Sequence, residues 1–329
     1  MNEVKRLSVV SPVFNEEENI NYFYRELKTV LNSLNQPHEI ILINDGSQDS
    51  SLAKMIDLQQ NDPSIKIIDF SRNFGHQIAI SAGISQSTGD LVVVMDSDLQ
   101  DPPNVIPELI KKHQEGYDVV YAVRRKRKEN ILKKAAYASF YRILNKICSL
   151  DIPLDTGDFC LMTQTVATEL KNIPEKNRFV RGIRTWVGFK QVGLEYERQA
   201  RHAGKEKYTW TKLFKLAFDG IFSFSYFPLR LATILGFTMA GVSFITILIY
   251  LYNFIYNPSA LAGFTTNRIL ILLIGGVQLI IFGIIGEYLG RIYDEVRGRP
   301  LYIIKKIYQT QDYSNSNKHD EYPVKITRH

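Results

Sequence analysis

The sequence LVVVMDSDLQDPP, at residues 91–103, is the most informative segment for the fold, because it joins an apolar strand to a pair of carboxylates. Its first five residues are all apolar and include three valines, a pattern typical of a strand buried on both faces of a parallel sheet. Asp96 and Asp98 follow at the carboxyl end of that strand. Open α/β sheets bind ligands at this end of their strands, so the stretch predicts both a strand and a binding edge.

Four similar apolar runs occur in the first half of the chain, at residues 7–13, 39–44, 65–70 and 118–123. Segments suited to helices lie between the runs, at residues 16–34, 49–60, 76–87 and 103–115. Strands that alternate with helices in this way predict an open, mainly parallel α/β sheet. A polar turn is expected later, at the sequence LDTGDF of residues 154–159.

Polar residues follow each of the first four strands, among them Asn15, Asp45, Arg72 and Asp96. Because the carboxyl ends of parallel strands meet at one edge of a sheet, these side chains are expected to converge. A merely solvated rim would look the same after any one strand. Polar groups after four strands in succession favour a binding site.

Asp96 and Asp98 have the arrangement expected of ligands for a hard divalent cation. Mg²⁺ takes one or two carboxylates together with phosphate oxygens and waters. Such a cation can neutralise the charge that develops on a diphosphate leaving group. A pair of solvated turn carboxylates and a helix-capping aspartate are the structural alternatives. The pair is common by itself, and the LQDPP sequence that follows makes it more specific.

The last third of the chain contains long apolar runs at residues 231–252 and 269–286. Each is long enough to cross a hydrocarbon core of about 30 Å, which takes about 20 helical residues. A buried core helix is the alternative, and two such runs joined by a short uncharged loop argue against it. Basic residues flank the pair on both outer sides, namely Arg230, Arg291, Arg297, Arg299, Lys305 and Lys306. The positive-inside rule therefore predicts a membrane hairpin with both ends in the cytoplasm.

The domain organisation follows from these patterns. Residues 1–210 are expected to form a cytoplasmic domain, since the first residues lack the apolar region of a signal peptide. Residues 211–228 predict an amphipathic helix in the membrane interface, with a helix packed on the soluble domain as the alternative. Residues 229–290 would form the hairpin, with spans at about 229–253 and 268–290, and residues 291–329 a basic segment and disordered tail.

The 329-residue chain has a net charge of +6, and basic residues cluster at positions 124–128 and 291–306. Beside apolar spans, such clusters suit phosphate groups or an anionic membrane surface. Nucleic acid is not expected as a partner, because no nucleic-acid-binding signature accompanies the clusters. The two cysteines, Cys148 and Cys160, lack metal-ligand spacing and are expected to be reduced core thiols. Glycines in the second span make a homo-oligomer an open alternative.

Seven sequence blocks carry a family resemblance, in the order SPVFNEEENI, INDGSQDSS, SRNFGHQ, MDSDLQDPP, DTGDFCLM, RFVRGIRTWVGF and RHAGKEKY. They resemble the polyprenyl-phosphate glycosyltransferases of glycosyltransferase family 2. The resemblance covers about residues 7–306 and is closest to the bactoprenol glucosyltransferases, with dolichol-phosphate mannose synthase more distant. It implies the nucleotide-diphospho-sugar transferase fold, of GT-A type, followed by the membrane hairpin.

The resemblance also implies roles for individual residues at the donor side. The nucleotide sugar would be bound by Pro12, Phe14, Asn15, Glu17, Asp45, Arg72, Gln77 and Asp96. A divalent cation, Mg²⁺ or Mn²⁺, would be held by Asp96, Asp98 and Gln100. Pro12 also has a plain explanation as a turn residue.

At the acceptor side, the resemblance implies phosphate binding by Arg124, Lys133, Lys134 and Arg201. Arginine suits phosphate because its planar group donates two hydrogen bonds at once. The catalytic acidic residues would be Asp155, Asp158 and Asp98. Asp155 and Asp158 match the family's acidic turn, and three roles stay open for them: orienting the acceptor, accepting a proton, and helping to hold the metal.

These features predict inverting transfer of one sugar, glucose from UDP-glucose, to undecaprenyl phosphate at the cytoplasmic membrane face. The chain lacks the QxxRW block of processive synthases, which favours a single transfer. The same chemistry with UDP-GlcNAc, an aminoarabinose-type sugar or GDP-mannose is an alternative. A non-catalytic membrane scaffold is a second alternative, and the intact DSD sequence argues against it.

Overall fold

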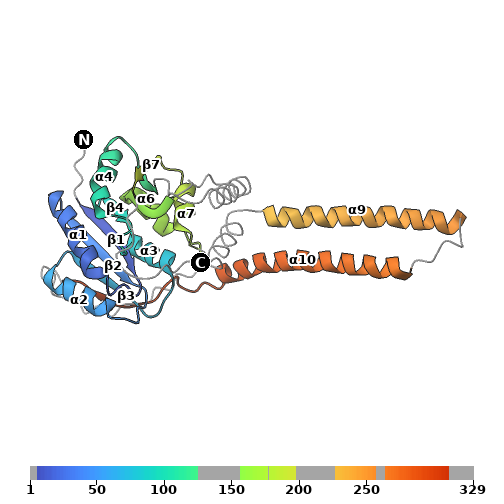
Figure 1. Cartoon of the computed structure of the whole chain (residues 1–329), viewed down its shortest axis with the longest axis horizontal. Coiled ribbons are helices and arrows are strands. Elements are labelled where there is room, and N and C mark those ends of the chain that lie inside the picture. Colours follow the sequence, from blue (N-terminus) through green and yellow to red (C-terminus); the bar gives the residue numbers. More distant parts are fainter. Residues whose placement is uncertain (1–5, 125–155, 177, 198–226, 257–263, 311–329) are drawn as a thin grey trace.

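The protein is described by a computed structural model, which covers residues 6–124, 156–176, 178–197, 227–256 and 264–310. Figure 1 shows an α/β domain from which two long helices extend side by side in one direction. These helices are α9 (Phe227–Tyr256) and α10 (Phe264–Val296).

The described part of the domain is built on one eight-stranded sheet with the order β7-β5-β6-β4-β1-β2-β3-β8. The strands are β1 (Leu7–Val13), β2 (His38–Asn44), β3 (Ile65–Phe70), β4 (Leu91–Val94), β5 (Val119–Arg124), β6 (Thr156–Thr163), β7 (Gln191–Tyr196) and β8 (Ile304–Tyr308). Strands β3, β2, β1 and β4 run parallel in succession, and β5 is parallel to β7. Strands β6 and β8 are antiparallel to their neighbours, so the sheet is mixed.

Helices cover both faces of the sheet. One face carries α1 (Ile20–Ser33), α2 (Ser51–Asn61), the 3₁₀ turn η1 (Pro103–Val105) and α4 (Ile106–Gln114). The other carries α3 (His76–Ser85), α6 (Gln164–Asn172) and α7 (Val180–Trp186). Successive side chains of a strand point to opposite faces, so Val9 packs in one core and Val10 in the other. This double burial explains why the strands are nearly continuous apolar runs.

Helix α3 lies especially close to the sheet. A Cβ atom added at Gly83 would be 2.2 Å from Cγ1 of Val10, so only glycine allows this approach. The close packing holds the first residues of α3, His76 and Gln77, at the carboxyl edge of the parallel strands.

The expected strands are confirmed, with the same bounds at residues 7–13 and 65–70 and shifts of one residue elsewhere. The expected helices are also present, although the first begins at Ile20 and the third ends at Ser85. The predicted polar turn at residues 154–159 is wrong where the structure describes it, because residues 156–159 lie in β6. This strand lies between β4 and β5 in the sheet. Its polar side chains contact residues that are distant in the sequence, so a local pattern does not predict the strand.

The segment after α10 contains a strand that the sequence did not predict. β8 pairs antiparallel with β3, and just before it the ring of Tyr302 stacks on Phe70 at 5.1 Å between centroids. The Tyr302 hydroxyl also lies 3.0 Å from Oγ of Ser85 on α3. An ordered strand therefore joins the end of α10 to the sheet. The expected disordered tail, at residues 311–329, is outside the described residues.

Helices α9 and α10 match the predicted hairpin. Their candidate spans are Phe227–Ile249 and Leu273–Val296, with mean hydropathies of 2.1 and 1.7. Only 6% and 0% of the two apolar windows is buried, unlike the core helix of a soluble domain. Both are therefore long and apolar enough to cross a membrane. The interfacial helix expected at residues 211–228 falls almost wholly outside the described residues.

Asp62, at the C-terminal end of α2, joins this helix to α1. Its carboxylate lies 2.6 Å from Nζ of Lys28 on α1 and accepts hydrogen bonds from Tyr24 at 2.9 Å and from the Ser64 hydroxyl at 2.6 Å. Burial alone would raise the pKa of Asp62, but these partners lower it to about 2.

We therefore predict a pH-dependent contribution from Asp62. A carboxylate with a lowered pKa stabilises the fold above its unfolded value of about 3.9 and loses that effect as the pH falls. Asp62→Asn should cost about 2 kcal/mol of unfolding free energy near pH 5 and little near pH 2. Chemical unfolding of the two proteins across this range measures the difference. Asp57→Asn, on the exposed side of α2, is the control, and an equal cost of Asp62→Asn at both pH values would contradict the prediction.

Candidate active site

The loops after β1 and β2 are joined at the carboxyl edge of the sheet. Asn15 has a left-handed backbone, with φ of 53°, and its Oδ1 accepts the N–H of Gln48 at 2.9 Å. The side chain of Glu17 accepts the N–H of Ser50 at 3.0 Å. Of the other predicted donor residues, Phe14 is exposed, while Pro12 is buried and its carbonyl accepts the Ser97 hydroxyl at 3.0 Å.

Asp45 holds the loop after β3 against the loop after β2. Its carboxylate is buried and accepts the N–H groups of Phe74 at 2.7 Å and Gly75 at 3.0 Å. Burial raises the pKa of Asp45, while the two backbone hydrogen bonds act in the opposite direction. The next residue must be glycine, because a Cβ at Gly46 would be 2.5 Å from the backbone nitrogen of Asn73.

Arg72 lies on the outside of the same loop. Its guanidinium carbon is 4.1 Å from the ring centroid of Phe74, and its Nη1 donates to the carbonyl of Asn73 at 2.9 Å. The side chain is exposed, so the cation remains accessible to an anionic ligand.

Asp96, Asp98 and Gln100 lie on the loop that follows β4, and both carboxylates are partly exposed. Asp98 accepts the N–H of Gln100 at 3.1 Å. Asp96 Oδ1 accepts no hydrogen bond from the described residues, although His76 Nε2 lies 3.4 Å away. Burial raises the pKa of Asp96 to about 6, against the opposing effect of the His76 charge. A buried anionic oxygen without a hydrogen-bond donor fits a cation site.

The residues around Asp96 offer few protein ligands to such a cation. No group of three or more His, Cys, Asp or Glu side chains suited to a metal occurs in the described ranges. A divalent cation held by Asp96 and Asp98 would therefore complete its ligand set with phosphate oxygens and water, as Mg²⁺ commonly does.

Asp158 is the centre of a buried polar cluster on β6. Arg181 Nε donates to its Oδ1 at 2.7 Å, and Gln77 Nε2 donates to its Oδ2 at 2.9 Å. His76 Nε2 lies 3.2 Å from the same Oδ2. Burial would raise the pKa of Asp158, but the charge of Arg181 and the contact with His76 hold it far below its usual range. Asp158 is therefore a fixed anion that brings α3 and α7 together.

The same contacts keep His76 charged. Burial lowers the pKa of His76, but the carboxylates of Asp96 and Asp158 outweigh this effect and raise it to about 9. Gln77 adds a further link, because its Oε1 accepts the N–H of Val180 at the start of α7 at 2.9 Å. The first turn of α3 thus connects the Asp96 loop with α7.

Arg124 lies at the end of β5, on the face of the sheet opposite to the Asp158 side chain. A Cβ at Gly157 would be 2.9 Å from Nη2 of Arg124, so the guanidinium rests directly on the glycine. Burial lowers the pKa of Arg124, but the charge of Asp101 and a hydrogen bond with Tyr196 outweigh it and raise the pKa. Other predicted residues lie outside the described part of the chain, namely Lys133, Lys134, Asp155 and Arg201.

The sequence did not single out four residues that the structure brings into the site, namely His76, Arg181, Asp101 and Tyr196. His76, Arg181 and Asp101 stand inside the sequence blocks of the family resemblance, which was the available signal. Tyr196 is outside those blocks and looks like an ordinary strand residue. Its partner becomes visible only when β7 is placed next to β5.

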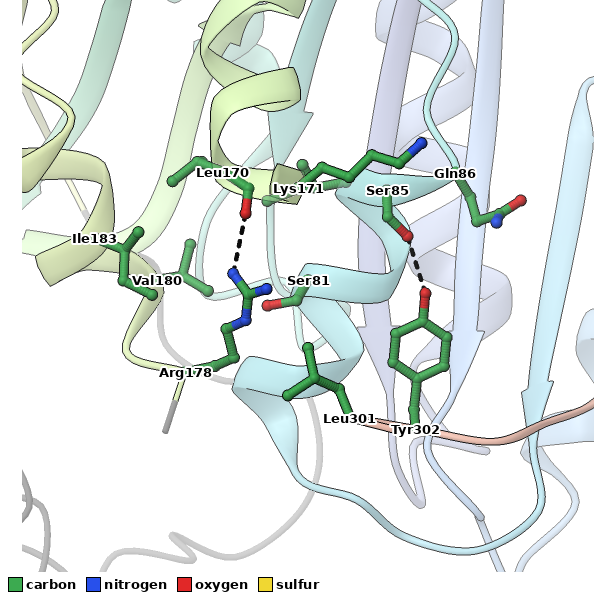
Figure 2. A pocket seen from close by; sticks show the side chains of 11 residues that line it. Ser81, Ser85, Gln86, Leu170, Lys171, Arg178, Val180, Ile183, Leu301 and Tyr302 are labelled. Carbon is green, nitrogen blue, oxygen red and sulfur yellow. Dashed lines mark hydrogen bonds between the residues drawn. The ribbon is translucent and has the colours of Figure 1, made fainter. Parts of the chain in front are cut away.

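A separate cavity of about 280 Å³ lies at the other end of α3 (Figure 2). Ser81, Ser85, Arg178 and Tyr302 are among its lining residues. Both terminal nitrogens of Arg178 donate to backbone carbonyls, at the C-terminal end of α6 and just beyond it. The cavity does not include the carboxylates of the β4 loop. Because the charged side chains suited to catalysis lie at the sheet edge instead, the polar cluster there is the candidate active site.

Known proteins are similar to this chain over most of its length. The family model described as Glycosyl transferase family 2 matches residues 8–170. The chain is 50% identical over 302 residues to the uncharacterized glycosyltransferase YkcC of Bacillus subtilis, covering 92% of this chain and 94% of that protein. The chain belongs to glycosyltransferase family 2. The predicted GT-A fold and enzyme class are confirmed, and the protein is a glycosyltransferase.

This family 2 glycosyltransferase is similar to other proteins over the same length. It is 43% identical to the uncharacterized glycosyltransferase sll0501 of Synechocystis, covering 92% of this chain and 95% of that protein. It is 42% identical to the prophage bactoprenol glucosyl transferase homolog of Escherichia coli, covering 92% of this chain and 99% of that protein. The resemblance to bactoprenol glucosyltransferases is therefore confirmed.

The buried pair of Asp158 and Arg181 leads to a stability prediction. Arg181→Met leaves the carboxylate without its main cation, and breaking a buried pair in this way costs about 3 kcal/mol. Thermal unfolding of the purified glycosyltransferase in detergent measures the loss. Asp158→Asn in the same background should recover part of it, since a neutral amide does not need the cation. Arg25→Met, at an exposed arginine over the ring of Tyr22, is the control. An unchanged midpoint for Arg181→Met would contradict the prediction.

Proposed function

We propose that this enzyme transfers a single glucose from UDP-glucose to undecaprenyl phosphate at the cytoplasmic face of a membrane, with inversion at the anomeric carbon. The main support is the 42% identity to a bactoprenol glucosyl transferase homolog over 92% of the chain. The part of this chain outside the match is shorter than either apolar helix, because each helix has 30 or more residues. The match therefore includes at least part of both helices.

The donor would bind along the carboxyl edge of β1 to β4. The nucleotide would contact the first two loops, through Pro12, Phe14, Asn15, Glu17 and Asp45, with Arg72, Gln77 and Asp96 toward the diphosphate. The exposed ring of Phe14 and the exposed cation of Arg72 are the donor-side groups best suited to direct contact. Asn15, Glu17 and Asp45 already hold the loops together, so they would act partly by shaping the site.

Asp96, Asp98 and Gln100 would hold Mg²⁺ or Mn²⁺. When bound, the cation would neutralise charge on the departing diphosphate. Asp96 suits this role because its Oδ1 is buried and accepts no hydrogen bond from the described residues. Asp98 is fixed near it by the N–H of Gln100.

Arg124 would bind the acceptor phosphate, together with Lys133, Lys134 and Arg201. A phosphate oxygen of the lipid forms the new bond to the anomeric carbon as the bond to the nucleotide diphosphate breaks. A phosphate monoester is largely a dianion at pH 7, because its second pKa is near 6. Alignment and charge compensation therefore contribute more than a strong base.

In this scheme, Asp158 would hold Arg181 and Gln77 in position and would not accept a proton. Both of its oxygens already accept hydrogen bonds, from Arg181 and Gln77, and its pKa is far below that of a proton acceptor at neutral pH. Asp155 keeps the three roles considered for it, which are orienting the acceptor, accepting a proton and helping to hold the metal, while Asp98 would hold the cation.

The two apolar helices would cross the membrane as a hairpin with both ends in the cytoplasm. Residues 1–210 would form the cytoplasmic domain, 211–228 the interfacial helix, 229–290 the hairpin and 291–329 the basic C-terminal segment. Such an arrangement brings a soluble donor and a membrane-bound acceptor to one site. Self-association through the second span is compatible with it.

The first test concerns the carboxylates of the β4 loop. Asp96→Ala and Asp98→Ala should each lower turnover by a factor of about 100 or more, since each removes charge stabilisation from the leaving group. Sugar transfer is measured with radiolabelled donor and reconstituted enzyme, with and without EDTA and added Mg²⁺ or Mn²⁺. Asp90→Asn, at the opposite end of the same strand, is the matched control. Full activity of the two variants, or of the wild type in EDTA, would reject the cation site.

The second test identifies donor and acceptor. UDP-glucose, UDP-GlcNAc, GDP-mannose and an aminoarabinose-type nucleotide sugar are compared with undecaprenyl phosphate in bilayers. We expect transfer from UDP-glucose to exceed the others by about tenfold or more, a difference of about 1.4 kcal/mol. Preference for another sugar would change the donor assignment, and transfer from none would favour a non-catalytic scaffold.

A further inference from the structure

Arg124, Tyr196 and Asp101 meet on the side of the sheet that carries α4. Strands β5 and β7 are parallel, and Arg124 is the register partner of Tyr196 at their carboxyl ends. Register partners point to the same face of a sheet, so the two side chains lie together. Asp101 reaches them from the loop after β4, and its residue is only 1% exposed.

The contacts form a directed chain. The hydroxyl of Tyr196 donates to Oδ1 of Asp101, and Arg124 shares a hydrogen bond with Tyr196 while it feels the charge of Asp101. A tyrosine hydroxyl suits the middle position, because it can donate to an anion and accept from a cation at once. The arginine is thus tied to a buried carboxylate through one hydroxyl group.

Two neighbours limit the movement of this chain. The ring of Tyr196 packs edge-on against Phe159, with 5.8 Å between centroids. A Cβ atom added at Gly157 would lie 2.9 Å from Nη2 of Arg124, so the guanidinium packs directly against the glycine. The guanidinium is therefore restricted by Gly157 at the sheet and by Tyr196 at the side.

We propose that Tyr196 and Asp101 are positioning residues that hold the Arg124 guanidinium in the orientation needed to bind the acceptor phosphate. This inference rests on the proposed acceptor role of Arg124. Asp101 follows Gln100 directly, so the loop that carries the donor-side carboxylates also sets the position of the acceptor-side arginine.

A purely structural role for Tyr196 predicts different behaviour. A hydroxyl that only stabilises the fold would change the midpoint of unfolding and affect donor and acceptor kinetics alike. A hydroxyl that orients Arg124 would change the KM for the lipid acceptor selectively. Tyr196→Phe separates the two, since it keeps the ring packing against Phe159 and removes one hydrogen-bonding group.

The experiment measures KM for undecaprenyl phosphate and for UDP-glucose, or whichever donor the panel identifies, in reconstituted enzyme. Tyr196→Phe should raise the acceptor KM about tenfold, the scale of one hydrogen bond to a charged group, and leave the donor KM within about twofold. Tyr24→Phe is the matched control, because Tyr24 also donates to a buried aspartate, Asp62, but lies on α1. The control variant should leave both KM values unchanged.

A double-mutant cycle with Arg124→Gln tests whether Tyr196 acts through the arginine. In the Arg124→Gln background, Tyr196→Phe should have no further effect on the acceptor KM, because coupled residues are not additive. An equal effect in both backgrounds would overturn the proposal, as would an equal rise of donor and acceptor KM.

The cycle also distinguishes failure of this inference from failure of the proposed function. If Arg124→Gln raises the acceptor KM but Tyr196→Phe does not, only the positioning role is rejected. If Arg124→Gln leaves the acceptor KM unchanged, the acceptor role of Arg124 is rejected and the positioning role falls with it.

Discussion

Four carboxylates lie close together at the edge of the sheet where β4 ends and β6 begins, and their mutual repulsion has to be compensated. They are Asp96, Asp98, Asp101 and Asp158, and the charges of the last three raise the pKa of Asp96. Each carboxylate removed from water needs a cation or hydrogen-bond donors, since an isolated buried charge is very costly. The arrangement of side chains around the candidate active site follows from this requirement.

The compensation comes from both faces of one strand. On one side of β6, Asp158 pairs with Arg181 and contacts His76, which connects it to α7 and α3. On the other side, Gly157 leaves room for Arg124, whose charge offsets that of Asp101. Adjacent residues of a strand point to opposite faces, so two neighbours in the sequence serve two separate clusters. Asp96 lies between them, and its Oδ1 accepts no hydrogen bond from the part of the chain that the structure describes.

The apolar hairpin is attached to this domain through ordered contacts. The backbone N–H of Lys176 donates to Glu295 near the end of α10 at 2.6 Å, and its Nζ donates to the carbonyl of Arg299 at 2.5 Å. Lys176 precedes α7, the helix that supplies Arg181, and β8 adds the chain beyond α10 to the sheet. The end of α10 is therefore held close to the elements that build the site. A fixed spacing of this kind would suit the proposed transfer from a soluble donor to a membrane-bound acceptor.

Local sequence patterns were enough to predict the parallel strands, the carboxylate pair beyond β4 and the apolar hairpin, because each is encoded by a continuous stretch of residues. The family resemblance added Asp158, Arg124 and Gln77 as predicted site residues. Three further features became visible only in the folded chain: Arg181 compensates the charge of Asp158, Tyr196 joins Arg124 to Asp101, and residues 304–308 complete the sheet. These contacts join residues that are far apart along the chain, from 23 positions between Asp158 and Arg181 to 241 positions between Ile67 and Tyr308. They depend on the insertion of β6 between β4 and β5 and on the return of the chain after α10, and no local periodicity encodes such a strand order.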